Sequence, residues 1–436
     1  MSGSTLAYLG GDPINTQPLP LYNMIGDEEK RAVAAVLDSG VLSGFAAQPN
    51  DDHYGGAVIR ALEDQFCETF GVRHAIAVNS ATSGLHAMVS ATRIGPGDEV
   101  IVPPYTMTAS ATAVLMTGAV PIFADIDDEI FCIDPASVEQ RITSRTKGIM
   151  AVNLYGHPAR LRELKALADR HGLFLLEDNA QAPLASIDGQ LSGTFGQSSV
   201  FSLNRHKVMQ CGEGGVVITN DDTVAERCRL MRNHGEVLVA DLGIEDIVNT
   251  LGLNYRMTNM EAAVASEQLK KLPAFTDARI ALADHLSARV AEIPGITPPT
   301  VLPGYRHVYY MHTMTYDAEV TGIPRDLFVK AVQAEGFQLA AGYVKPLYLE
   351  PLYQKRICFG PDGFPFSANP NIDADTYRAG ICPVVERLQN RDLMWTAMIY
   401  PTLTTSFLDG FADAIEKVIA NRDALLADAA ANSKVA

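Results

Sequence analysis

Cysteine is scarce in this sequence of 436 residues. The six cysteines, at positions 67, 132, 211, 228, 358 and 382, are widely spread and form no C-x-x-C pair. This pattern argues against a disulfide framework and favours free thiols in a reducing compartment. No two cysteines or histidines have the spacing of zinc ligands, so we expect no metal site.

Long apolar runs are also missing. No stretch has enough consecutive apolar residues to span a bilayer. The N-terminus, MSGSTLAYLGGDPINTQ, lacks the basic region and apolar core of a signal peptide. We therefore expect a cytoplasmic protein that has no membrane partner.

Basic residues are outnumbered, because 34 Lys and Arg face 51 Asp and Glu, giving a formal net charge of -17. This balance argues against non-specific binding to nucleic acid or to anionic membranes. It still permits an anionic small-molecule substrate, which a local cluster of arginines could bind. The sequence also lacks a G-x-G-x-x-G motif after a strand, which makes a nicotinamide-dependent oxidoreductase a weak interpretation.

Apolar residues are plentiful, and a hydrophobic content of 47% is typical of a globular protein with a large core. Short apolar runs without polar alternation indicate strands buried on both faces, at 74–78, 99–103, 120–126, 148–155 and 173–178. Amphipathic helical stretches such as 158–172 lie between them. The alternation predicts an α/β fold with a large, doubly wound, mostly parallel sheet. Two further runs, 199–203 and 215–220, lie too close together for a helical crossover, so they are antiparallel or distant in the sheet.

The chain is expected to have three parts. Residues 1–25 form an N-terminal arm, and residues 26–275 form a large α/β domain that begins with a helix at 27–40. Near residue 275 the rhythm of strands and helices changes. Residues 276–436 are therefore predicted to form a smaller C-terminal α+β domain, with helices at 324–336 and 405–426.

A polar turn follows the first strand in the segment HAIAVNSATSGLHAMVSA. Ser80, Ala81, Thr82 and Ser83 lie where the first amides of a helix have no partner, and such amides bind phosphate. An ordinary helix cap is the alternative interpretation.

An acidic pair ends a fully apolar strand in the segment LFLLEDNAQAPLA. Glu177 or Asp178, if buried there, needs a cation or a hydrogen-bond donor. A protonated pyridine nitrogen would be such a partner, and this is the state in which pyridoxal phosphate acts as an electron sink. Gln181 could contact the cofactor's ring oxygen. A surface turn remains the alternative.

One lysine lies between an apolar run and a glycine cluster in SLNRHKVMQCGEGGVV. Desolvation of Lys207 would favour its neutral amine, the form that Schiff-base chemistry needs. By itself this would be an ordinary loop lysine. The phosphate turn, the acid and the lysine nevertheless follow strands in chain order, and ligands of open α/β sheets bind at the carboxyl ends of strands.

These motifs resemble the DegT/StrS-type sugar aminotransferases, which belong to the aspartate-aminotransferase-like, fold-type I class of pyridoxal-phosphate enzymes. The most specific match is S-x4-K-x4-GEGG, formed by Ser202, Lys207 and residues 212–215. EDNAQA resembles the acid motif, NSATSGLHA the phosphate turn and VPPYTMTASATAVLMTGAVPIFADID the cofactor-stacking segment. MRNHG, LGLNYRMTNMEAAVA and CPVVERL match later landmarks, so the resemblance covers nearly the whole chain.

The resemblance implies roles for individual residues. Lys207 would form the Schiff base with pyridoxal 5'-phosphate, Asp178 would pair with the pyridine nitrogen, and Gln181 would contact the ring hydroxyl oxygen. The phosphate would be bound by Thr82, Ser83 and Ser202, in addition to the turn residues Ser80 and Ala81 that the helix N-terminus already indicates. Asn254 is similar to a residue that reaches the phosphate from the neighbouring subunit, which implies a homodimer with shared active sites.

At one position the sequence departs from the family. An aromatic residue commonly follows the threonine of the stacking segment and covers the cofactor ring, whereas here Met107 occupies that place. A thioether can pack on a ring face, so binding is still expected. Tyr105, two residues earlier, is the other candidate for the cover.

The implied reaction is a ping-pong transamination from glutamate or glutamine to a keto sugar, free or nucleotide-linked, or to a keto-cyclitol. A dehydratase of the same family is an alternative, but there a histidine replaces the lysine. A non-catalytic regulator that retains the fold is another. Substrate contacts are expected among polar residues near the motifs, each of which could instead form a surface salt bridge: His157, Arg205, His206, Arg232, Tyr343 and Lys345.

Overall fold

The computed structural model describes residues 5–19 and 21–432. Its main element is a seven-stranded sheet in the order β1-β9-β8-β5-β4-β2-β3. The strands are β1 (His74–Val78), β2 (Glu99–Val102), β3 (Val120–Phe123), β4 (Thr146–Val152), β5 (Phe174–Asp178), β8 (Ser198–Ser202) and β9 (Gly215–Thr219). Neighbouring strands from β3 to β8 are parallel, and β9 is antiparallel to both β8 and β1. The predicted α/β fold is confirmed, and of the two alternatives for 199–203 and 215–220 the structure has the antiparallel pair.

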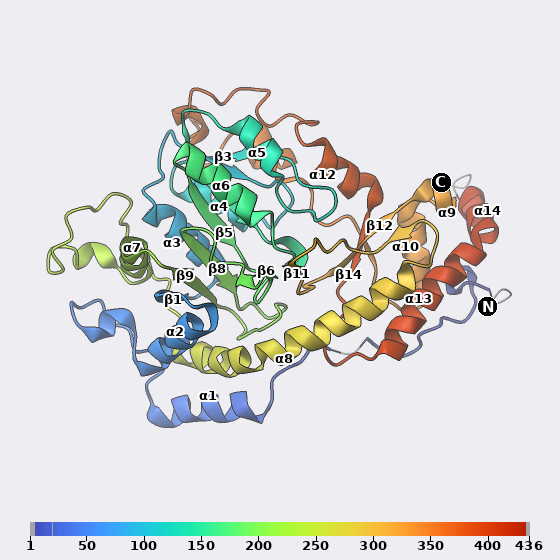
Figure 1. Ribbon diagram of the computed structural model, residues 1–436, viewed down its shortest axis with the longest axis horizontal. Helices are drawn as coiled ribbons and strands as arrows, with labels where there is room; N and C mark the ends of the chain where they lie inside the picture. The colour runs from blue at the N-terminus through green and yellow to red at the C-terminus, as the bar shows by residue number, and fades with distance from the viewer. Residues whose placement is uncertain (1–4, 20, 433–436) are drawn as a thin grey trace.

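Helices pack around this sheet (Figure 1), which explains why its strands show no polar alternation. They are α2 (Ala57–Phe70), α3 (Ala81–Ala91), α4 (Ala109–Met116), α5 (Pro135–Arg141), α6 (Leu161–His171) and α7 (Asp222–Arg232). Helix α6 shows the local logic. Its buried face consists of Leu161, Leu164, Leu167 and Ala168, and it ends at Gly172 in the left-handed conformation.

The long helix α8 (Asn259–Val290) runs below the large sheet towards a smaller sheet (Figure 1). It begins at a capping box, in which Thr258 accepts a hydrogen bond from the amide of Glu261 and Glu261 accepts one from the amide of Thr258. Helix α1 (Asp27–Ser39) packs against α8. Because α8 reaches both sheets, one rigid element can carry side chains to the space between them.

The smaller sheet is antiparallel, in the order β10-β12-β14-β13. Its strands are β10 (Ile296–Thr297), β12 (His312–Tyr316), β13 (Ala340–Ala341) and β14 (Leu393–Thr396). Around it lie α9 (Ala318–Thr321), α10 (Arg325–Ala334), α13 (Thr405–Ala420) and α14 (Arg422–Asn432). A third, three-stranded sheet joins β11 (Tyr305–Arg306), β6 (Ser186–Ile187) and β7 (Gln190–Leu191).

The single helix expected at 405–426 is instead two helices. Helix α13 ends at Ala420, and the side-chain amide of the capping residue Asn421 donates a hydrogen bond to the carbonyl of Lys417 at 2.9 Å. An asparagine side chain that bonds to nearby backbone groups competes with helix continuation. The apolar pattern persists through this break, so the sequence periodicity did not reveal it.

We propose the division of the described chain into a large part that ends near residue 275 and a smaller part that follows. Helix α8 crosses this boundary. A stretch beyond it returns to the large sheet, where Tyr348, Tyr353 and Tyr377 pack around Phe123. The predicted arm 1–25 and the predicted C-terminal domain include residues 1–4, 20 and 433–436, which lie outside the described residues.

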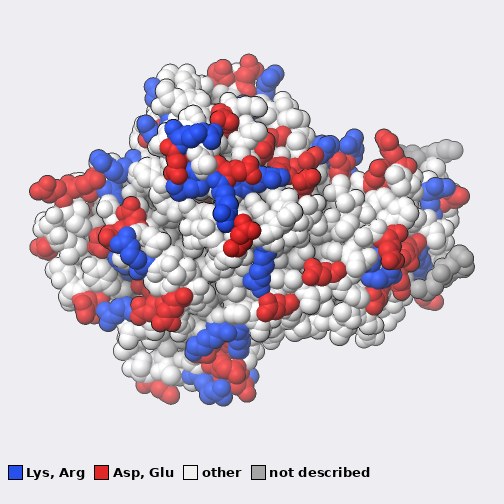
Figure 2. Space-filling model, in the orientation of Figure 1, with Lys and Arg blue, Asp and Glu red and all other residues white. Residues whose placement is uncertain are grey.

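No helix within residues 5–19 and 21–432 is long and apolar enough to cross a membrane. On the face shown in Figure 2, Lys and Arg side chains are interspersed with Asp and Glu side chains rather than forming a continuous basic surface. This face therefore offers no extended cationic track for a nucleic-acid backbone.

Candidate active site

A cavity of about 220 Å³ lies at the carboxyl ends of β1, β2, β5 and β8. It is lined by residues from four separate sequence motifs, including Ser80, Ala81, Thr82, Met107, Asp178, Gln181, Ser202 and Lys207. The parallel sheet brings these motifs together because its strands end at one edge. The structure therefore gathers most of the residues that the sequence predicted for the cofactor.

Lys207 projects from a compact loop between β8 and β9. The loop is closed by backbone hydrogen bonds from Leu203 to Gly214 and from Arg205 to Gly212. Gly212 has a φ of 95°, which a residue with a side chain would adopt only with strain. The loop geometry thus depends on the glycine cluster and sets the position of the lysine.

The amine of Lys207 is buried and forms no hydrogen bond or ion pair within the described residues. Its Nζ lies 4.6 Å from the ring centroid of Tyr310. Burial lowers the pKa of Lys207 to about 8, while the nearby Asp178 opposes this shift. The neutral amine, which is the nucleophilic form, is therefore far more populated near neutral pH than in an ordinary lysine.

Asp178 is a buried carboxylate at the end of β5. Its Oδ2 accepts a hydrogen bond from the hydroxyl of Ser110 at 2.7 Å, and its Oδ1 accepts one from the amide of Ala180 at 3.1 Å. Burial raises the pKa of Asp178, against the effects of Ser110, Ala180 and Lys207. A cationic ring nitrogen placed beside it would favour the carboxylate form.

The polar turn after β1 leads into α3, and Ser80 caps the helix by accepting a hydrogen bond from the amide of Ser83 at 3.1 Å. The amides of Ala81 and Thr82 have no hydrogen-bond acceptor among the described residues. At Gly215 a Cβ atom would lie 2.6 Å from the nitrogen of Ala81, so only glycine allows β9 to approach this closely. The result is an N-terminal helix site for an anion.

Ser83 departs from its expected role. Its amide is bonded to Ser80, and its hydroxyl donates to Oδ1 of Asn79 at 2.7 Å. It is buried and absent from the cavity lining. The expectation that Ser83 contacts the phosphate is therefore corrected: both of its donors serve the turn itself.

Gln181 connects the two halves of the site. Its Oε1 accepts a hydrogen bond from the amide of Tyr155 at 2.7 Å, and its Nε2 donates to the hydroxyl of Tyr343 at 3.1 Å. Met107 lines the cavity, whereas Tyr105 is fully buried and donates to Gln389 at 2.8 Å. The structure thus places the methionine, not the tyrosine, at the cavity wall.

The residues present fit pyridoxal phosphate. The free amides of Ala81 and Thr82 suit its phosphate, the neutral amine of Lys207 suits its aldehyde, and the buried carboxylate of Asp178 suits a protonated ring nitrogen. A buried amine and a buried carboxylate are each unfavourable without a ligand. One cofactor would provide a partner for both.

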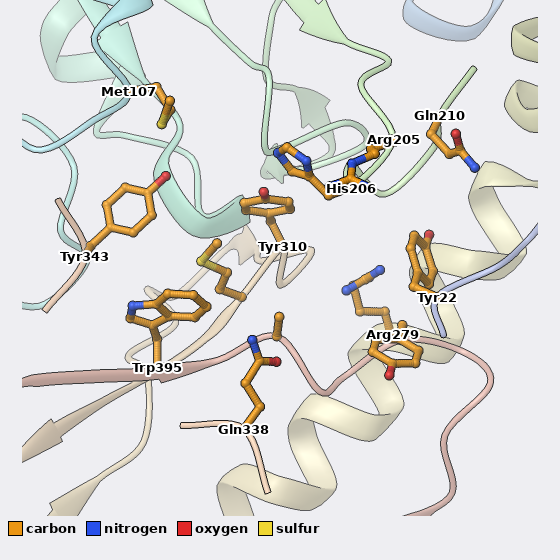
Figure 3. Close-up of a pocket in the computed structure, with 13 residues that line it drawn as sticks. Tyr22, Met107, Arg205, His206, Gln210, Arg279, Tyr310, Gln338, Tyr343 and Trp395 are labelled. Carbon is orange, nitrogen blue, oxygen red and sulfur yellow. The ribbon is translucent and has the colours of Figure 1, made fainter. Parts of the chain in front are cut away.

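A second cavity, of about 610 Å³, adjoins the first (Figure 3). Met107 and His206 line both cavities. Tyr343 and Trp395 stand on one side of the second cavity, with Arg205 and Arg279 on the other (Figure 3). Of the predicted substrate residues, Arg205, His206 and Tyr343 thus lie where a substrate could reach Lys207.

Three other predicted substrate residues lie elsewhere, and these predictions are corrected. Arg232 is fully buried and donates to Glu63 at 2.6 Å, so its charge is already neutralised inside the protein. His157 is buried, with its ring stacked on Tyr305 at 5.2 Å. Lys345 is exposed and lies 3.6 Å from Glu350. None of the three lines either cavity.

Several residues of the site were not identified from the sequence. Ser110 could have been identified from the sequence, because it lies in the stacking segment, four residues after Thr106. In the structure its hydroxyl donates a hydrogen bond to the predicted acid, Asp178. Tyr310, Arg279 and Trp395 belong to no motif. They reach the site because α8 and the chain around β12 and β14 of the smaller sheet border the same cavity.

The pKa of Lys207 makes a direct prediction for the cofactor-free protein. Below pH 8 most of the Lys207 amine is protonated, so acetylation by acetic anhydride should increase as pH rises through 8 and level off above that pH. Ordinary lysines, with a pKa of about 10.4, should continue to gain reactivity to higher pH. Peptide mass spectrometry would measure both in one sample. A Lys207 profile that follows the ordinary lysines would contradict the effect of burial.

Comparison with known proteins identifies the relatives of this chain. The DegT/DnrJ/EryC1/StrS aminotransferase family matches residues 23–371. The L-glutamine:2-deoxy-scyllo-inosose aminotransferase of Streptomyces kanamyceticus is 36% identical over 83% of this chain and 86% of its own length. GDP-perosamine synthase of Caulobacter vibrioides is 37% identical over 68% of this chain and 79% of its own.

Solved structures agree with this assignment. The structure of DesI in the presence of its TDP-sugar product superimposes with a TM-score of 0.79 at 28% identity. The match covers 97% of this chain and 98% of DesI.

Proposed function

The chain belongs to the DegT/DnrJ/EryC1/StrS aminotransferase family, and from this premise we propose that it moves an amino group from glutamate or glutamine to a keto sugar or a keto-cyclitol. It is a pyridoxal-phosphate-dependent aminotransferase. The observation that carries the proposal is the buried, unpaired amine of Lys207, which shares a cavity with the carboxylate of Asp178. This cavity adjoins a larger one that is rich in aromatic side chains.

Lys207 would hold the cofactor and then act as the proton carrier. When bound, pyridoxal phosphate supplies the carbon that takes up the amino group and a ring that withdraws electrons from the adjacent bond. Lys207, with a pKa of about 8, could accept a proton at Nζ from the substrate carbon. It could then donate that proton to the carbon that takes up the amino group. Asp178 would keep a proton on the ring nitrogen, since Ser110 and Ala180 hold its carboxylate in place.

The larger cavity supports the choice of a cyclic acceptor. Trp395 is fixed because its Nε1 donates to the carbonyl of Gly342 at 2.6 Å, and its ring lies edge-on to that of Tyr343. Rigid aromatic faces offer apolar area to the C–H groups of a sugar or cyclitol ring. Gln338 and His206 add polar groups elsewhere in the lining of the same cavity.

We also infer a homodimer in the cytoplasm. Asn254 is exposed and outside the cavities of its own chain, as a residue that serves a neighbouring active site would be. Exposed apolar side chains occur in the segments nearby. Leu251 lies three residues before Asn254, and the carbonyls of the exposed Val41 and Leu42 accept hydrogen bonds from Asn259, five residues after it. A second copy would cover this apolar area. All six cysteines are free thiols, which supports a reducing compartment.

The proposed function is tested by incubating the holoenzyme with glutamate or glutamine and a panel of keto sugars, nucleotide-linked keto sugars and keto-cyclitols. We expect mass spectrometry to show one class of acceptor gaining an amino group as the donor becomes its oxo acid. Bleaching of the cofactor's visible absorbance by the donor alone would show the first half-reaction. Failure of both donors to change that absorbance would refute the proposed donors.

A further inference from the structure

One arginine of the larger cavity has no acidic partner. Arg279 projects from α8 and is buried, with 4% of its surface exposed. Its Nη1 donates to the carbonyl of Tyr309 at 3.4 Å, and its Nε has no hydrogen-bond partner. Within residues 5–19 and 21–432, no ion pair with a carboxylate is formed by its guanidinium, and the ionisable groups that act on it are those of Tyr22 and Tyr310.

The other buried arginines of the described chain differ from Arg279. Arg227 pairs with Asp246 at 3.0 Å, Arg232 with Glu63 at 2.6 Å, and Arg325 with Asp326 at 2.9 Å. Removal of a guanidinium from water is unfavourable unless an anion replaces the lost hydration. At Arg279 burial lowers the guanidinium pKa, and the compensating contacts come from the tyrosines Tyr22 and Tyr310. The charge is thus held in place without being neutralised.

Tyr310 is a neighbour of both the guanidinium of Arg279 and the amine of Lys207. Figure 3 shows Arg279 rising from α8 between Tyr22 and Tyr310 into the cavity. The ring of Tyr310 also contacts Nζ of Lys207, at 4.6 Å. The hydroxyl of Tyr22 donates to the carbonyl of Val208, the residue after the lysine, and its ring lies 5.3 Å from the guanidinium. Arg279 is therefore fixed close to the lysine loop.

We propose that Arg279 binds a carboxylate of the amino donor and so determines donor recognition; the inference rests on the proposed function. A guanidinium matches a carboxylate with two parallel hydrogen bonds, and no Asp or Glu among the described residues that line the larger cavity competes for it. Every amino-acid donor carries a carboxylate near the reacting carbon, which suits a cation that shares the neighbour Tyr310 with the amine. A phosphate of a nucleotide-linked acceptor is also an anion that a guanidinium binds. Separate measurements of donor binding and acceptor binding distinguish the carboxylate from the phosphate.

The test compares Arg279→Gln and Arg279→Lys with the unaltered holoenzyme in separate half-reactions. We expect Arg279→Gln to raise the apparent dissociation constant for glutamate or glutamine by about 10²-fold, because it removes the charge. Arg279→Lys keeps the charge but loses the planar fork, so its rise should be about tenfold. The acceptor constant, measured from the amino form of the cofactor, should stay within about twofold in both variants.

Arg289→Gln is the matched control, since Arg289 lies on the same helix but pairs with Asp409 and Asp413 away from the cavity. Its donor and acceptor constants should not change. If Arg279→Gln fails to fold, as judged by thermal unfolding and cofactor absorbance, Arg279→Lys decides. The role of Arg279 would be refuted if its variants keep the donor dissociation constant of a wild-type enzyme that turns over normally. A change in the acceptor constant alone would refute it as well. A wild-type enzyme that accepts neither donor would refute the proposed function itself.

Discussion

Lys207→Ala should abolish transamination. The substitution removes the buried amine that both holds the cofactor and carries the proton, so kcat should fall by about 10⁴-fold or more. The visible absorbance of the bound cofactor should disappear as well, because no other amine within the described residues lines the cavity. Steady-state kinetics and an absorbance spectrum of the purified protein would measure the two effects.

Two further variants show whether the loss is specific. Lys207→Arg keeps a cation at the position but removes the nucleophilic amine, and it should be as inactive as Lys207→Ala. Lys30→Ala removes an exposed lysine that pairs with Asp27 on α1, and its activity should remain normal. Near-normal turnover in Lys207→Ala would show that the mechanism proposed for this site is wrong.

Asp178→Asn should retain the cofactor but react slowly. The amide has nearly the same shape as the carboxylate, yet it cannot hold a proton on the pyridine nitrogen by charge. Loss of such a preorganised electrostatic contact lowers kcat by about 10²- to 10³-fold. Single-turnover kinetics with a saturating donor would separate this effect on chemistry from any effect on binding.

Ser110→Ala provides a graded comparison for Asp178→Asn. It leaves the carboxylate but removes the hydroxyl that donates to it at 2.7 Å, so the decrease in kcat should be smaller, about tenfold or less. Equal and unchanged kinetics in Asp178→Asn and in the wild type would refute the pairing of Asp178 with the ring nitrogen. A larger decrease in kcat for Ser110→Ala than for Asp178→Asn would contradict the expectation that the carboxylate contributes more to the reaction than the hydroxyl bonded to it.

The sequence by itself predicted where the buried strands lie along the chain and which polar residues follow them. Unbroken apolar runs identified strands buried on both faces, and the polar residues directly after them predicted the lining at Ser80, Asp178 and Lys207. These residues line one cavity because the carboxyl ends of parallel strands share one edge of a sheet. Residues that follow different strands therefore meet, even when about a hundred positions separate them in the chain.

Long-range packing decided the rest. Arg232 and Arg279 both lie in helices, and although only Arg232 belongs to a motif, the residues next to them do not show which guanidinium has a buried acidic partner. Only the tertiary structure shows that Glu63 neutralises Arg232 inside the core, whereas Arg279 faces a cavity beside two tyrosines. Whether a buried charge has a partner depends on elements that are distant in sequence. That pairing determines whether an arginine stabilises the fold or is available to bind a substrate.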